Sequence, residues 1–71
     1  MKLTEPQRAL LSLCSGKPMG VDFYDAAKIG ARGPTLAAMV RFGLLRKHTY
    51  PDTSNAWFIT EAGKSLLRGQ P

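Results

Sequence analysis

GARGPTLAAMVRFGLLRK, residues 30–47, is the stretch that decides how this chain folds. Pro34 suits the first turn of a helix, where its missing N–H needs no partner, and Gly43 suits the position just past a helix end, where φ becomes positive. Between them, apolar residues recur at the i, i+3, i+4 spacing of a helix, at Leu36, Met39 and Val40. Two leucines follow Gly43 directly. The stretch therefore predicts a short helix whose apolar face continues into an extended segment.

Size and composition predict one small folded domain over residues 1–71. The chain has 71 residues, of which 44% are hydrophobic and 21% are charged, and this balance argues against disorder. A core of this size supplies only about 3–5 kcal/mol of stability, and it leaves little room for an enclosed active site. The sequence has no phosphate-binding loop and no nucleophile–base pair at a recognisable spacing, so we expect no enzymatic activity.

The cysteine and histidine content limits the chemistry further. Cys14 is the one cysteine, so it cannot form an internal disulfide, and together with the one histidine, His48, it cannot supply a structural zinc site. We therefore expect a buried Cys14, a cytoplasmic location, and no cofactor or metal. The apolar runs are shorter than the ~20 residues of a membrane span, which predicts no membrane insertion.

The positive charge is concentrated in the second part of the chain. Residues 1–27 carry three basic and three acidic side chains, whereas residues 28–71 carry seven basic and two acidic ones, so this part holds all of the net charge of +5. A basic region of this kind favours a polyanionic partner, most simply nucleic acid. An ordinary solvated surface with an excess of lysine and arginine remains the alternative.

A capping pattern predicts a first helix near the N-terminus. Thr4 is followed three residues later by Gln7, as in a capping box, and Ser15-Gly16 end the helix. Its apolar stripe is expected to consist of Leu10, Leu13 and Cys14, with Leu11 at the edge of the stripe.

A second short helix is expected before the central one. Asp22 can cap a helix over residues 23–29, and Gly30 stands at its end as a stop signal. The buried side of this helix is expected to consist of Phe23, Ala27 and Ile29. Met19 or Val21 would fill the core from the connector before it. The two helices on either side of Gly30 then form a helix–turn–helix unit.

The sequence after Gly43 predicts a β-hairpin and a last helix. Residues 44–50 form the first strand, the turn signal Pro-Asp-Thr-Ser-Asn covers residues 51–55, and the aromatic and β-branched residues 57–59 form the second strand. Trp57 and Phe58 must point to opposite faces, one into the core and one partly exposed. Thr60 caps a final helix over residues 61–67, which packs back through two leucines and ends at Gly69.

Three motifs along the chain resemble those of a known family. Leu3-Thr4, Gln7 and Leu10-Leu11 resemble the "LTxxQ…LL" opening of many bacterial winged-helix regulators. Met39 with residues 43–45 is similar to their "L…GLV" junction, and residues 59–67 resemble their "LTxxGxxLL" exit from the wing. The chain thus resembles a small bacterial or phage winged helix-turn-helix domain of the MarR-like and PadR-like groups.

The resemblance implies an α+β fold and a DNA-binding function. The expected fold is a winged helix-turn-helix with a three-helix core, a two-stranded β-hairpin wing and a short C-terminal helix. The expected function is sequence-specific binding of double-stranded DNA in transcription regulation. The central helix would enter the major groove, and the hairpin tip would lie near the backbone or the minor groove.

Candidate DNA contacts follow from this arrangement. Arg41 is the first choice, because its guanidinium can bind guanine through two hydrogen bonds. The other candidates lie before the helix, on it, in the first strand and at the hairpin tip: Arg32, Thr35, Ala38, Arg46, Lys47, Thr53, Ser54 and Asn55. On a strand, Arg46 and His48 share one side and Lys47 takes the other, so these three cannot all face one partner.

A second function from another class is also compatible with the sequence. The central helix is rich in alanine, and its outward positions offer no asparagine or glutamine for reading adenine. The domain could instead be a protein-interaction adaptor that lacks DNA binding, anchored by Phe42, Tyr24 or a wing aromatic. A lone DNA-binding module has a small interface, so a homodimer on two half-sites is a further expectation.

Overall fold

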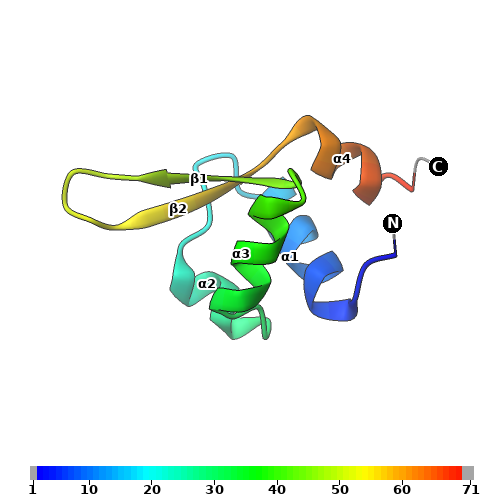
Figure 1. The fold of residues 1–71 in the computed structure, drawn as a ribbon, viewed down its shortest axis with the longest axis horizontal. Helices are drawn as coiled ribbons and strands as arrows, with labels where there is room; N and C mark the ends of the chain where they lie inside the picture. The colour runs from blue at the N-terminus through cyan, green and yellow to red at the C-terminus, as the bar shows by residue number, and fades with distance from the viewer. Residues whose placement is uncertain (1, 70–71) are drawn as a thin grey trace.

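The structure, a computed structural model, describes residues 2–69 as a small α+β domain. Four helices and one two-stranded antiparallel sheet follow one another along this part of the chain: α1 (Glu5–Ser15), α2 (Phe23–Lys28), α3 (Gly33–Arg41), β1 (Leu45–Thr49), β2 (Asn55–Ile59) and α4 (Glu61–Leu67). The hairpin extends from one side of the helical body, and α4 lies at the opposite side (Figure 1). The predicted element order is confirmed, with ends that differ by a few residues.

Side-chain caps begin three of these helices at the predicted residues. Thr4 Oγ1 accepts a hydrogen bond from the backbone N–H of Gln7, and Gln7 Oε1 accepts one from the backbone N–H of Thr4, which completes a capping box. Asp22 Oδ1 accepts from the N–H of Asp25 at 2.7 Å at the start of α2. For α3, the first turn contains proline, and Arg32 at the N-cap makes no side-chain cap bond.

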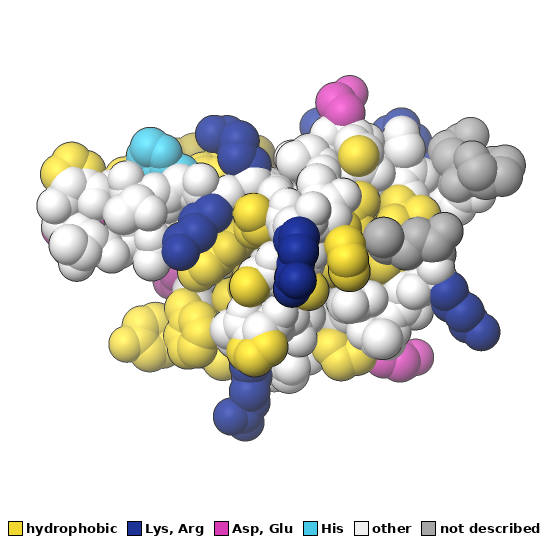
Figure 2. All heavy atoms as spheres, viewed as in Figure 1, with side chains coloured by type: hydrophobic (Ala, Val, Ile, Leu, Met, Phe, Trp, Pro, Cys, Tyr) yellow, Lys and Arg dark blue, Asp and Glu magenta, His cyan; other side chains and the backbone are white. Residues whose placement is uncertain are grey.

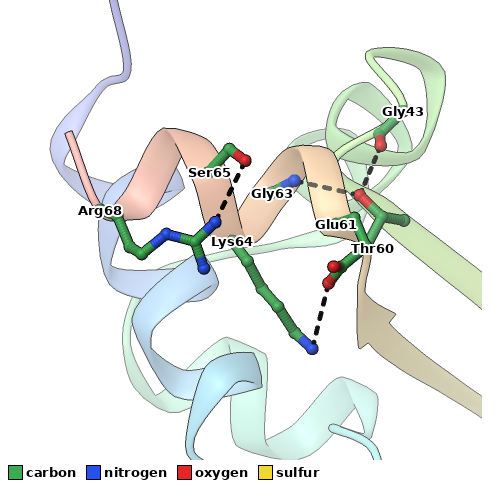
Figure 3. A network of polar contacts seen from close by, with 7 residues as sticks. All are labelled: Gly43, Thr60, Glu61, Gly63, Lys64, Ser65 and Arg68. Atoms are coloured by element: carbon green, nitrogen blue, oxygen red, sulfur yellow. Dashed lines mark hydrogen bonds and ion pairs between the residues drawn. The ribbon is translucent and has the colours of Figure 1, made fainter. Parts of the chain in front are cut away.

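Thr60 joins α4 to the end of α3. Its hydroxyl accepts a hydrogen bond from the N–H of Gly63 at 3.1 Å and donates one to the carbonyl oxygen of Gly43 at 2.7 Å (Figure 3). Gly43 itself has a φ of 79°, in the left-handed region that glycine adopts without strain. The chain can therefore leave α3, enter β1, and be tied at the same point to the helix that follows the hairpin.

The hairpin pairs Lys47 with Trp57 and closes through a tight tip. At the tip, Thr53 donates its N–H to the carbonyl of Tyr50 at 2.9 Å, and Tyr50 donates its N–H to the carbonyl of Ser54 at 2.8 Å. On the outer side of β2, Val21 and Trp57 exchange two backbone hydrogen bonds of 2.9 Å each. The segment before α2 therefore adds a single-residue third strand to the sheet.

The core lies where α1, α3 and the base of the hairpin meet. Its buried residues come from these elements, from α2 and from the three connectors between α1 and β1: Leu10, Leu11, Cys14, Val21, Ala26, Ala31, Leu36, Met39, Leu44, Leu45 and Trp57. Trp57 is buried and Phe58 is half-buried, as their opposite faces predict. The apolar face of α3 thus continues into β1, as the central stretch predicts.

Two expectations for buried positions were wrong. On α1, Leu11 is fully buried and Leu13 only partly, because Leu11 lies against Gly63 where α4 packs on α1. On α2, Ala26 is the buried residue, whereas Phe23 is about half exposed and Ala27 is exposed. For the connector, the prediction of Met19 or Val21 is confirmed in favour of Val21, which fills the core, whereas Met19 is 87% exposed.

Candidate nucleic-acid interface

The solvent side of α3 carries Arg41 and Ala37, one helical turn apart. Both are exposed, whereas Leu36 and Met39 bury the opposite side of the helix. Figure 1 shows α3 along the face that is turned to the viewer, with the hairpin beside it. Of the predicted contacts on this helix, Arg41 is therefore the one whose side chain is fully presented to a partner.

The other predicted DNA contacts in this region differ in how far their side chains are exposed to solvent. Arg32, at the N-cap of α3, is exposed, so its side chain is open to a partner at the start of the helix. Thr35 and Ala38 are half-buried, because both lie nearer to the packed side of α3 than Ala37 does. Ala37 is absent from the predicted set, although its spacing of four residues from Arg41 places it on the same side.

The two strand cations that the sequence groups together lie on opposite faces of the hairpin. Lys47 is paired with Trp57, and its Nζ lies 5.8 Å from the Trp57 ring centroid, on the face that α3 also borders. Arg46 is paired with Phe58, and its Cζ lies 5.0 Å from the Phe58 ring centroid. The structure therefore brings Lys47 to α3 and separates Arg46 from it.

Arg46 belongs to a second basic region, away from α3. It lines a hollow of about 250 Å³ together with Lys17, Lys64 and Phe58. Lys17 is held by Asp25 at 3.0 Å and Lys64 by Glu61 at 3.4 Å. His48 shares the Arg46 side of the strand and stacks edge-on against Tyr50, with ring centroids 4.6 Å apart. A partner bound to α3 could not contact these residues at the same time.

An apolar groove runs between α3 and the hairpin. Its volume is about 370 Å³, and residues of α2, α3 and both strands line it: Phe23, Gly33, Leu36, Ala37, Val40, Lys47 and Trp57. On the face seen in Figure 2, hydrophobic side chains fill the region between α3 and the hairpin, with basic side chains beside them. Among these lining residues, the charged one is Lys47. The sequence did not predict this groove, because it depends on how α2 and the hairpin sit beside α3.

The cations around this groove are unpaired within residues 2–69. The ion pairs of that range are those of Lys17 and Lys64, so Arg32, Arg41 and Lys47 form none there. Arg32 precedes Gly33 of the groove lining, and Arg41 follows Ala37 of the lining by one helical turn. This side of the domain therefore combines three available positive charges with an apolar surface.

The hairpin tip is more acidic than expected for a phosphate contact. Asp52 Oδ1 accepts hydrogen bonds from Ser54 Oγ at 2.6 Å and from the Ser54 N–H at 3.0 Å. These two bonds lower the pKa of the Asp52 carboxyl, because they stabilise its negatively charged form. Asn55 begins β2, and its Oδ1 accepts from Thr49 Oγ1 at 2.7 Å. Thr53 and Ser54 therefore lie beside a carboxylate that repels phosphate.

The described residues were also compared with the requirements of a membrane span and of a metal site. Among residues 2–69, no helix has the length and hydropathy to cross a bilayer, and no three His, Cys, Asp or Glu side chains gather as a metal would require. Cys14 is 1% exposed, and burial raises the pKa of its thiol to about 11.

Comparisons of the chain with protein-family models, with curated proteins and with solved structures found no match.

Proposed function

We propose that this chain is a winged helix-turn-helix domain that binds double-stranded DNA through α3 and the adjoining face of the hairpin. The order of its helices and strands, with the Val21 segment added to β2, is compatible with such a fold. The observation that carries the functional proposal is that exposed cations without an ion pair among the described residues lie at both ends of α3, at Arg32 and Arg41, and on the adjoining strand, at Lys47. A duplex offers phosphates at close spacing to such a surface.

In this proposal each residue has a separate role on the duplex. Arg41 reads a guanine in the major groove through its guanidinium, and the methyl group of Ala37 contacts the methyl group of a thymine. Arg32 and Lys47 hold phosphates on either side of the helix, which fixes its register without reading sequence. Transcription would then be regulated sterically, by occupation of an operator.

The size of the domain favours two copies on the DNA. Single DNA-binding modules bury roughly 600–1,000 Å² of protein surface, and two half-sites are the usual means by which small modules gain specificity. We therefore include a homodimer on a palindromic operator in the proposal. Arg46 and the hollow that it lines face away from α3, so they remain open to a second protein or to neighbouring DNA.

Fluorescence anisotropy on a mixed-sequence duplex at rising salt tests the proposal. Wild-type protein should bind at low salt, and log K should fall against log salt with a slope of about −0.9 for each phosphate neutralised. Arg41→Glu should abolish this binding, whereas Arg8→Glu, which makes the same charge change on α1, should leave most of it. Equal losses in the two variants, or no binding even at low salt, would contradict the proposal.

A further inference from the structure

The groove between α2, α3 and the hairpin has features that a duplex does not use. Phe23 and Trp57 line it together with the apolar residues Leu36 and Val40. Phe23 is 46% exposed, which leaves aromatic surface in contact with water. Bases and phosphates offer no bulky apolar group for such a groove, because a thymine methyl is small. The groove therefore suits an inserted protein side chain better.

Charge decides which kind of protein could supply this side chain. Lys47 is the charged residue of the lining, and Arg32 and Arg41 lie directly before and after lining residues on α3. The acidic side chains nearest in sequence to Phe23 of the groove already have partners: Asp22 caps α2, and Asp25 pairs with Lys17. A second copy of this chain would bring another net charge of +5 to a positive surface. The occupant must instead carry negative charge.

We propose that this groove docks an acidic peptide segment of another protein. The segment inserts one aromatic side chain between Phe23 and Trp57, and its carboxylates pair with Lys47 and with the flanking arginines. Aromatic anchors in apolar pockets with charged surroundings are the usual carriers of binding energy in protein interfaces. A volume of about 370 Å³ lies within the usual range of ligand pockets, roughly 300–1,000 Å³.

This interaction does not depend on DNA binding, although the two would interfere. The peptide and the duplex would share Arg41 and Lys47, so a bound partner would prevent α3 from entering a major groove. An acidic protein that occupies the groove would therefore release the domain from an operator. If the chain binds no DNA, the same docking surface still acts as the adaptor site.

A peptide titration followed by two-dimensional NMR tests the docking surface. The probe is a synthetic twelve-residue peptide with a central tryptophan flanked by glutamates, added to ¹⁵N-labelled full chain. We expect saturable shifts confined to α3, Phe23, Lys47 and Trp57. Two control peptides should lose at least tenfold in affinity: one with alanine in place of tryptophan, and one with lysine in place of each glutamate.

Protein variants make the test independent of the peptide controls. Lys47→Glu should weaken the acidic peptide at least tenfold and improve binding of the lysine peptide. Ala37→Trp should fill the groove and abolish binding, with Ala37→Ser as the matched control; the spectrum of each free variant reports whether it is folded. Three results would overturn the proposal. The peptide could shift residues over the Arg46 face, or the alanine peptide could bind equally well. In the third, a duplex shifts the groove residues and the peptide shifts none of them.

Discussion

Thr53 occupies a backbone conformation that suits glycine better. Its φ is 70° at the hairpin tip, in the left-handed region where a β-branched side chain is strained. That conformation costs an L-residue roughly 1–2 kcal/mol, and glycine avoids this cost at an entropic penalty of roughly 0.5–1 kcal/mol. We predict that Thr53→Gly raises the free energy of unfolding by about 0.5 kcal/mol. Urea denaturation measures the free energy of unfolding. The control variant Thr49→Gly, in the extended part of β1, should lower it instead.

Gly63 of α4 lies against the segment that leads from α3 into β1 and against Ile59 of β2. A Cβ atom at this position would collide with the carbonyl oxygen of Leu44 and lie 2.8 Å from Ile59 Cγ1. Neither neighbour can move freely, since Leu44 O accepts the N–H of Thr60. We predict that Gly63→Ala lowers the free energy of unfolding by about 2–3 kcal/mol.

Gly33→Ala is the matched control for this prediction. Gly33 lies in the first turn of α3, and a Cβ atom added there would meet no heavy atom within 4 Å outside its own helix backbone and its two chain neighbours. Alanine there should change stability by less than about 1 kcal/mol, because the helix propensity that it adds offsets the strain of a helical residue before Pro34. Denaturant unfolding of both variants would contradict the account of α4 packing if Gly63→Ala proved as harmless as Gly33→Ala.

The buried thiol of Cys14 makes the free energy of unfolding depend on pH in the alkaline range. Burial raises the pKa of its thiol from 9.0 to about 11, so the unfolded chain releases the proton at lower pH than the folded chain. Between these values the folded state binds more protons, and the free energy of unfolding falls as pH rises, by up to about 1.4 kcal/mol per pH unit. Denaturation at a series of pH values should show a steeper loss for wild type than for Cys14→Ala. Parallel slopes would contradict the account.

At the scale of single elements, the two faces of the hairpin should differ in their effect on DNA binding. Lys47 lies on the face that borders α3, and Arg46 lies on the face that carries Phe58. We predict that Lys47→Glu weakens duplex binding at least tenfold, because it removes one phosphate contact and adds a repulsive charge. Arg46→Glu should have a smaller effect. Fluorescence anisotropy at one fixed salt concentration compares the duplex affinities of the two variants. An equal loss of affinity in both would mean that the duplex does not bind at α3.

Local chemistry made the helices and strands predictable from the sequence, but it did not make their packing predictable. Thr4, Asp22 and Thr60 each bond to the backbone of a residue three positions later, so short sequence windows contain the whole signal for the helix starts. The choice of Leu11 over Leu13 for the core depends on α4, which lies far along the chain. Tertiary contact of this kind leaves no local pattern to read.

The same division applies to the candidate site as a whole. Strand alternation alone separates Arg46 from Lys47, but which of them meets α3 depends on where the hairpin packs. The groove requires Phe23, Ala37 and Trp57 from three elements, so it could not be found in any one stretch of sequence. The concentration of positive charge in residues 28–71 was visible from the sequence; of those cations, Lys47 lines the groove, and Arg32 and Arg41 adjoin lining residues on α3.

For the whole molecule, we propose that the α3 side of the domain is the face that binds DNA. The most direct measurement is a titration of ¹⁵N-labelled protein with a mixed-sequence duplex at low salt. We predict that amide shifts concentrate at Arg32, Ala37, Arg41 and Lys47, while the amides of Lys17, Arg46 and Lys64 on the other basic face change little. Shifts concentrated on that other face, or no shifts at all, would contradict it.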